Sequence, residues 1–116
     1  MQDKFIERNK VKRFLEKAYS YRENVVVFTQ GESKAHFLKK CEVCWELQSL
    51  GISFICEARF AFNRGRADIL VLEGGGCAIE LVVSEPNWSI DLKRQKYPVP
   101  IVTLGLAQVF EEKMIR

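Results

Sequence analysis

The sequence predicts an α/β fold with a mixed sheet, and three observations support this prediction. A long segment of helical character, from about residue 31 to residue 50, is followed by Gly51, a residue that commonly ends helices. Three apolar runs separated by tight turns come next, which predicts three strands. A short helical segment and one further apolar run follow. The predicted order is therefore helix, three strands, helix and strand, which is typical of an α/β sheet protein.

The N-terminal residues 1–30 predict a helix and a strand that extend this core. Apolar residues recur at roughly helical spacing between residues 3 and 18, which favours an amphipathic helix. Residues 25–28 are β-branched or aromatic and predict a short strand. Thr29 and Glu32 have the spacing of a capping box, so we expect the long helix to begin at Thr29.

The strands of the core are predicted from alternation and from turn residues. Apolar residues alternate between residues 52 and 62, and further apolar runs cover residues 67–72 and 77–83. Gly74, Gly75 and Gly76 lie between the last two runs, so we expect a hairpin there.

The C-terminal part of the chain predicts two helices and a strand. Pro86 interrupts the chain, and a short helix is predicted over residues 88–96. An apolar run at residues 101–104 predicts the last strand. Residues 106–115 are amphipathic and predict a C-terminal helix.

Length and composition favour a single globular domain over residues 1–116, with its core at about residues 31–105. The chain has 116 residues, 47% of them hydrophobic, and a net charge of +3, so nucleic-acid binding is permitted but not indicated by charge alone. No apolar run is long enough to cross a membrane. The four cysteines lie in apolar stretches without a secretion signal. We therefore expect reduced thiols in a cytoplasmic protein rather than a zinc site.

Two acidic residues stand out because each interrupts an apolar run. Asp68 opens the run before the glycine turn, and Glu80 lies inside the run after it. Strands joined by a tight turn bring both carboxylates to one edge of the sheet. Carboxylates are costly among apolar side chains unless something pairs with them, and a divalent cation is one such partner. The alternative interpretation is a solvated sheet edge.

The predicted order of elements and the two acids resemble the PD-(D/E)xK nuclease superfamily, whose restriction-endonuclease-like core is αβββαβ. Residues 31–97 resemble more closely the CoiA-like nucleases, and a similarity to Holliday-junction-resolvase-like enzymes is also present. The matching segments are Glu32-Ser33-Lys34-Ala35-His36 with Lys40, Arg66-Ala67-Asp68, Glu80-Leu81-Val82-Val83-Ser84, and Arg94 with Tyr97. The resemblance covers about two thirds of the chain.

The chain departs from the superfamily pattern at Val82. The pattern places a lysine two residues after the motif glutamate, on the same strand face, and CoiA-like proteins have a glutamine there. A valine cannot activate water or stabilise charge on a phosphate. The absence of the lysine therefore either abolishes activity or requires another cation nearby, and Lys40 is the expected substitute.

The resemblance implies a role for each candidate residue. Asp68 and Glu80 would hold Mg²⁺ or Mn²⁺, with Glu32 or Glu42 completing the metal site, and His36 would bind or orient a phosphate. Four basic residues are expected to contact DNA: Arg66, Lys93, Arg94 and Lys96.

Structural roles explain several of these residues equally well. Glu32 fits the capping box, and His36 and Lys40 fit a solvated helix face. Glu57 is either a third acid at the same edge or the partner of Arg59 or Arg66. The basic residues also serve solubility.

The function predicted from the sequence is metal-dependent hydrolysis of a DNA phosphodiester. A small domain has little surface with which to hold DNA, so we expect a homodimer that presents two sites. The alternative is a catalytically degenerate module that keeps the fold and binds nucleic acid or protein without cutting. A structural protein with incidental acids is the third interpretation.

Overall fold

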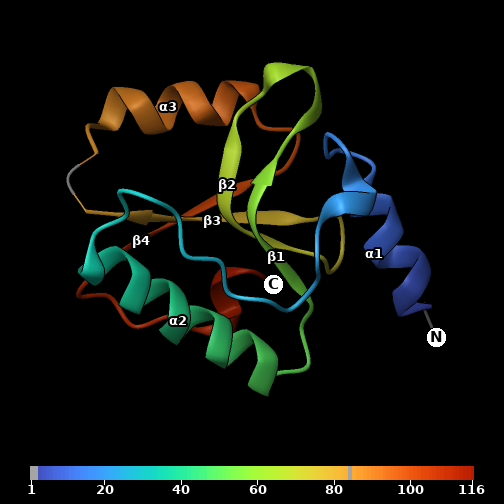
Figure 1. Ribbon diagram of the computed structural model, residues 1–116, viewed down its shortest axis with the longest axis horizontal. Coiled ribbons are helices and arrows are strands. Elements are labelled where there is room, and N and C mark those ends of the chain that lie inside the picture. Colours follow the sequence, from blue (N-terminus) through green and yellow to red (C-terminus); the bar gives the residue numbers. More distant parts are fainter. Residues whose placement is uncertain (1–2, 84) are drawn as a thin grey trace.

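The computed structural model describes residues 3–83 and 85–116, so Ser84 of the family-like motif lies outside the described residues. A four-stranded mixed sheet forms the centre of the molecule (Figure 1). Its strands follow the chain in the order β1-β2-β3-β4. The first two pairs are antiparallel, and β3 and β4 are parallel. The strands are β1 (Phe54–Arg59), β2 (Arg66–Val71), β3 (Cys77–Val82) and β4 (Ile101–Gly105).

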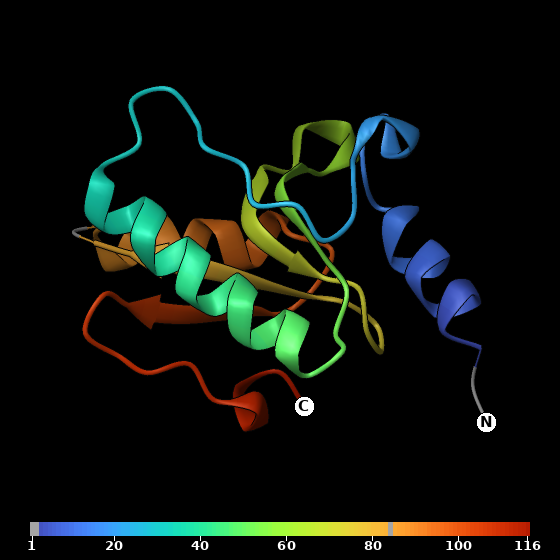
Figure 2. The same cartoon turned by 60° about the horizontal axis from the view of Figure 1, so that its bottom comes forward.

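Two helices lie on opposite sides of this sheet, and a third flanks it. Helix α2 (Lys34–Ser49) lies in front of the sheet and α3 (Asn87–Lys96) lies behind it in Figure 2. Helix α1 (Lys4–Lys12) lies beside the sheet. The predicted α/β class with a mixed sheet is confirmed. None of the helices in the described part of the chain is long and apolar enough to cross a membrane.

Each face of the sheet has its own apolar core, because alternate strand residues point to opposite sides. On the α2 side, helix residues Val43 and Leu47 are fully buried against strand residues such as Ile69 and Ile79. The core on the other side is built from strand residues, α1 and the residues after α3. Its members include Ile55, Leu70, Ala78, Val11, Leu15, Tyr97 and Val99. The acidic residues of interest lie where these two cores end.

The start of α2 differs from the prediction. Ser33, not Thr29, is the N-cap, and its hydroxyl accepts a hydrogen bond from the His36 backbone N–H. The reciprocal contact of a capping box is nevertheless present, since Glu32 accepts a hydrogen bond from the Thr29 N–H at 3.2 Å. Because Glu32 N–H also donates to the Thr29 carbonyl, this contact closes a turn before the helix. The two hydrogen bonds between Thr29 and Glu32 therefore fix Glu32 just before the first turn of α2.

The N-terminal extension is less regular than predicted. Helix α1 ends at Lys12 rather than near residue 18, and the next residues turn so that Leu15 bridges to Phe60. Residues 25–28 form no strand. They run extended past α2, and the Val27 carbonyl accepts a hydrogen bond from Lys40 instead of from a neighbouring strand.

The predicted C-terminal helix over residues 106–115 is wrong. The described chain there contains only a 3-10 turn, at Glu112–Met114. An irregular path lets Phe110 reach the core on the α2 side, where it is 6% exposed. Lys39 of α2 donates a hydrogen bond to the Gln108 carbonyl and fixes this path.

Candidate active site

Three carboxylates form one row across three neighbouring strands. The register pairs Ile69 with Ile79, so Asp68 and Glu80 face each other across β2 and β3. The register on the other side pairs Cys56 with Ile69 and Ala58 with Ala67, so Glu57 faces Asp68 across β1 and β2. The register of the two strand pairs aligns these residues, although their side chains meet different helices: Glu57 contacts Lys40 of α2, and Glu80 contacts Lys93 of α3.

The backbone pairing of β2 and β3 ends next to Asp68 and Glu80. Beyond this point the two carboxylates accept hydrogen bonds from the backbone of the opposite strand. The backbone N–H of Asp68 donates to Glu80 Oε2 at 2.8 Å, and the backbone N–H of Leu81 donates to Asp68 Oδ2 at 2.9 Å. The two acidic residues are therefore immediate neighbours, as the sequence predicted. A carboxylate that accepts a backbone N–H keeps a fixed orientation, which a ligand-binding group requires.

Glu80 is the buried member of the pair. It is 1% exposed, and its Oε1 accepts a hydrogen bond from the Tyr97 hydroxyl at 2.9 Å and lies 3.1 Å from Lys93 Nζ. Burial and the nearby Asp68 charge raise the Glu80 pKa to about 7, although the Asp68 N–H, Lys93 and Tyr97 oppose this rise. Glu80 therefore exchanges its proton near neutral pH.

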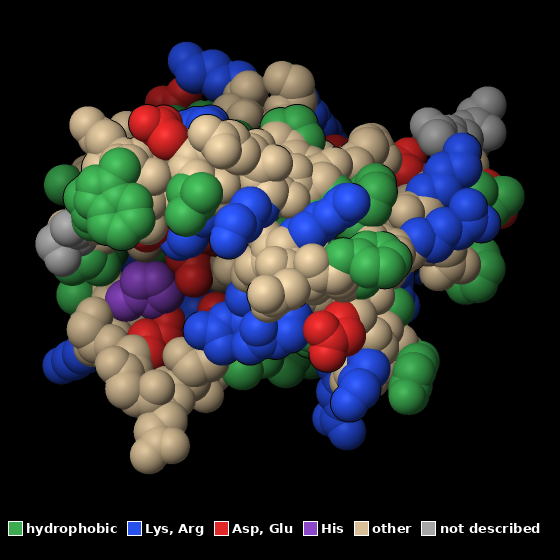
Figure 3. Space-filling view, turned by 90° about the horizontal axis from the view of Figure 1, so that it is seen from above, with side chains coloured by type: hydrophobic (Ala, Val, Ile, Leu, Met, Phe, Trp, Pro, Cys, Tyr) green, Lys and Arg blue, Asp and Glu red, His purple; other side chains and the backbone are tan. Residues whose placement is uncertain are grey.

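Asp68 is the accessible member, and it lies next to His36. The Nε2 of His36 is 3.5 Å from Asp68 Oδ2, and the Nδ1 contacts Glu32 Oε2. The imidazole thus lies between an acid of the loop before α2 and an acid of β2. In the described part of the chain, Asp68 has no Lys or Arg ion-pair partner. Figure 3 shows the purple histidine beside acidic side chains on this face.

Lys40 does not point at Asp68 and Glu80, which corrects the expectation from the sequence. Its Nζ lies 2.8 Å from Glu32 Oε2 and 3.4 Å from Glu57 Oε2, and it donates to the Val27 carbonyl. Burial lowers the Lys40 pKa, but these two carboxylates outweigh burial and raise it overall. Lys40 is fully buried, so it is not on a solvated helix face either. It is a charge that holds the loop before α2 against β1.

Glu57 has a strained backbone and a buried carboxylate. Its φ is 52°, in the left-handed region that residues with a side chain rarely adopt. Burial and the Asp68 charge raise its pKa, against the opposing effects of Lys40 and Arg66. Arg66 Nε lies 3.4 Å from Glu57 Oε1, while Oε2 has no hydrogen-bond partner among the described residues. Glu57 is thus both a third acid at the edge and the partner of Arg66.

Glu42 does not join this group. It lies two residues after Lys40 on α2, hence about 200° around the helix. Its side chain is 55% exposed and pairs with Lys39 at 3.2 Å. Glu32, which is 3% exposed and contacts His36, is the helix-proximal acid of the site. Burial raises the Glu32 pKa, but hydrogen bonds from Lys40, Thr29 and His36 outweigh burial and lower it.

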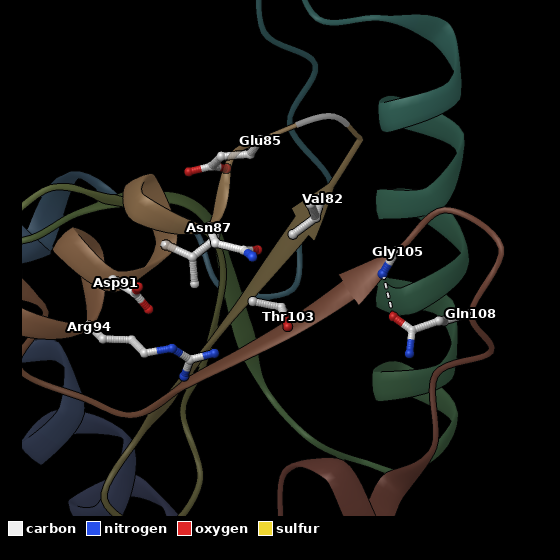
Figure 4. Close-up of a pocket in the computed structure, with 9 residues that line it drawn as sticks. Val82, Glu85, Asn87, Asp91, Arg94, Thr103, Gly105 and Gln108 are labelled. Atoms are coloured by element: carbon white, nitrogen blue, oxygen red, sulfur yellow. Dashed lines mark hydrogen bonds between the residues drawn. The ribbon is translucent and has the colours of Figure 1, made fainter.

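The four predicted DNA-binding residues separate into two places. A cavity of about 270 Å³ between the β1–β2 turn and α3 is lined by Arg66, Lys93 and Lys96, together with Arg64. Arg94 instead lines a cavity of about 430 Å³ at the ends of β3 and β4 and donates to the Ile101 carbonyl at 3.2 Å. Figure 4 shows Arg94 and Val82 in this second cavity.

Val82 and Glu80 lie on the same side of β3, as predicted. Val82 lines the cavity next to α3, and Glu80 contacts α3 through Lys93. Lys93 Nζ also lies 2.8 Å from Glu85, and these two carboxylates raise the Lys93 pKa although burial lowers it. The cation beside Glu80 therefore comes from α3, and the sequence had suggested only a DNA contact for Lys93. Lys93 lies four residues before Tyr97, a spacing that places both side chains on one side of a helix, and both contact Glu80. This spacing was the signal in the sequence that could have identified Lys93.

Comparison of the chain with protein-family models, with curated proteins and with solved structures found no match. Within the described residues, no three His, Cys, Asp or Glu side chains converge tightly enough to hold a metal ion. Mg²⁺ commonly uses only one or two protein carboxylates and keeps several waters. Burial is the largest cause of the raised pKa values of Glu57 and Glu80, and the Asp68 charge adds to both rises.

Proposed function

We propose that this domain hydrolyses phosphodiester bonds of DNA with the help of Mg²⁺ or Mn²⁺, as the resemblance to PD-(D/E)xK nucleases implies. One observation carries the proposal: Asp68 and Glu80 face each other where β2 and β3 part. The order α2, β1, β2, β3, α3, β4 around them supports a nuclease core.

Asp68 and Glu80 are the residues that would hold the metal ion. Asp68 offers an accessible carboxylate without a Lys or Arg partner among the described residues, and Glu80 can release its proton near neutral pH. Glu32 lies behind His36 and supports the site without needing to bind the ion. A bound divalent ion lowers the pKa of its water and offsets charge on the scissile phosphate.

The other residues supply orientation and positive charge. Glu32 fixes the His36 ring through Nδ1, so Nε2 is directed at Asp68, and in the imidazolium form Nε2 can donate to a phosphate oxygen. Lys93, rather than Lys40, takes the role that Val82 cannot fill, because its ammonium lies beside Glu80. Arg66 is about half exposed at the rim and can contact the next phosphate.

A cleavage assay with paired variants tests this proposal. Linear, nicked and branched DNA are incubated with the chain and Mg²⁺ or Mn²⁺. Asp68→Asn should abolish cutting while the fold remains, and Lys93→Met should lower turnover strongly. Lys10→Met is the control, since Lys10 is an exposed lysine of α1 and has no part in the proposed site. Unchanged cutting by Asp68→Asn would assign the activity to a contaminant.

A second function is favoured by one specific observation. Val82 replaces the motif lysine, and the nearby cations Lys40 and Lys93 are already paired with carboxylates. The same arrangement suits a degenerate nuclease domain that binds nucleic acid without cutting. Such a module shifts DNA in a gel but leaves it intact in Mn²⁺. The homodimer remains a prediction for sedimentation analysis.

A further inference from the structure

The turn between β1 and β2 exposes an aromatic side chain on a strained backbone. Phe62 is 87% exposed, with φ at 61°, and the following Asn63 has φ at 57°. A phenylalanine in this left-handed conformation is strained, whereas asparagine adopts it more readily. Exposing a large aromatic ring offers the folded chain no compensating burial. A strained backbone that projects an aromatic ring into solvent points to a role in binding.

The turn is held rigidly against its neighbours. The Phe60 N–H donates to the Gly65 carbonyl at 2.8 Å, and the Ala61 N–H donates to the Phe14 carbonyl at 2.8 Å. The Tyr97 hydroxyl oxygen lies 2.7 Å from the Arg66 carbonyl oxygen, so its single proton is shared between this carbonyl and Glu80. A Cβ on Gly65 would lie 2.7 Å from the Tyr97 ring, so only glycine permits this close approach. These contacts fix the backbone of the turn that carries Phe62 at its tip.

Positive charge surrounds this tip. The Arg64 guanidinium lies 5.7 Å from the centre of the Phe62 ring, a cation–π distance. Arg64, Arg66, Lys93 and Lys96 line the adjoining cavity. In the described part of the chain, Arg64 and Lys96 have no ion-pair partner, so their charge is free for a ligand. Figure 1 shows the tip beside the C-terminal end of α3, and Figure 3 shows blue side chains gathered over this face.

We propose that Phe62 stacks on an unpaired base, while the groove between the β1–β2 turn and α3 binds the phosphates on either side of it. The ligand is then a nucleic acid with a single-stranded segment, such as a fork or an open junction. Aromatic stacking requires an accessible base face, which paired bases inside a duplex do not offer. The inference rests on the proposed function only in taking nucleic acid as the ligand.

Fluorescence anisotropy in EDTA tests this inference without cleavage. The probes are a labelled oligo-dT strand, a blunt duplex, and a forked duplex with an unpaired arm. Phe62→Ala should weaken binding of the strand and the fork about tenfold, the effect expected for one stacked base. Binding of the blunt duplex should not change. Phe62→Trp should retain binding, because it restores an aromatic face.

Two further variants separate stacking from charge and from general hydrophobicity. Trp45→Ala removes another exposed aromatic ring, 69% exposed on α2, and should leave all three affinities unchanged. Arg64→Ala with Lys96→Ala should weaken all three probes. It should also reduce the slope of log affinity against log salt by about 0.7 per phosphate contact on the single strand. Circular dichroism confirms the fold of each variant.

The outcomes distinguish this inference from the proposed nuclease function. Equal effects of Phe62→Ala and Trp45→Ala, or tighter binding of blunt duplex than of the fork, would overturn the stacking role. If cleavage in Mn²⁺ then remains, the nuclease proposal stands alone. If no DNA is cut but binding depends on Phe62, the stacking role is supported and the nuclease proposal fails.

Discussion

The buried carboxyl of Glu80 should control how the stability of the fold changes with pH. Its pKa is raised from 4.5 to about 7, first by burial and then by the Asp68 charge. An acid whose pKa is higher in the folded state stabilises the fold fully below the unfolded pKa. That contribution is lost as the pH rises through the folded pKa. At 1.36 kcal/mol per pKa unit, the loss is about 3 kcal/mol between pH 4.5 and pH 7.

Glu80→Gln removes this titration while keeping the shape of the side chain. The amide has one acceptor oxygen instead of two, whereas Tyr97, Lys93 and the Asp68 N–H all donate toward this position. The mismatch costs about 1–3 kcal/mol at every pH. The free-energy difference between parent and variant should therefore shift by about 3 kcal/mol in favour of the variant as the pH rises from 4.5 to 7.

Urea unfolding of both proteins at closely spaced pH values measures this difference. Glu85→Gln is the matched control, because Glu85 bonds to the same Lys93. Burial raises the Glu85 pKa, but Lys93 and Ser89 outweigh burial and lower it overall. Its stabilisation is present above the unfolded pKa and is lost as the pH falls, the opposite sign to Glu80. Differences that stay constant with pH, or that move in the same direction for both variants, would refute this reasoning.

Three more predictions concern the metal, the buried lysine and the aromatic turn. Mn²⁺ should raise the melting temperature more at about pH 8 than at about pH 6, because metal binding requires deprotonated carboxylates. Differential scanning fluorimetry measures this rise, and Asp68→Asn should remove it. Lys40→Met should lower the free energy of unfolding by about 3–5 kcal/mol, since it leaves the buried carboxylates of Glu32 and Glu57 without their cation. An unchanged urea midpoint would contradict this prediction. Phe62→Gly should raise stability by up to about 1 kcal/mol by removing backbone strain, whereas Phe62→Ala should not; equal unfolding curves would show that the turn is unstrained.

Local sequence signals predicted most of the core. The sheet strands have alternating or continuous apolar residues, and the chain turns back at the glycines between residues 74 and 76, as expected. Gly51 follows α2 with φ at 72°, a conformation that glycine adopts without strain. The same local pattern placed Asp68 and Glu80 on paired strands, which is why their proximity could be predicted.

Features that depend on distant contacts could not be predicted in this way. Residues 25–28 have strand propensity but pair with no strand. The Val27 carbonyl accepts a hydrogen bond from Lys40 instead. Residues 106–115 have a helical pattern, yet Phe110 packs into the α2-side core from an irregular segment. The partners of Lys40 and Lys93 lie on other elements, so spacing along one helix did not show which acid each lysine meets.

The row of acids also shows how the site can lack a strand lysine and still fold. Glu57 and Glu80 flank Asp68, and each has a cation from a different helix, Lys40 from α2 and Lys93 from α3. A lysine at position 82 would place a second ammonium on the side where Lys93 already spans Glu80 and Glu85, so the apolar Val82 avoids repulsion there. Asp68 remains the carboxylate between two others, and among the described residues only His36 is close enough to form an ion pair with it. The divalent cation of the proposed function would gain most by binding at Asp68, because there it would relieve the repulsion on both neighbours.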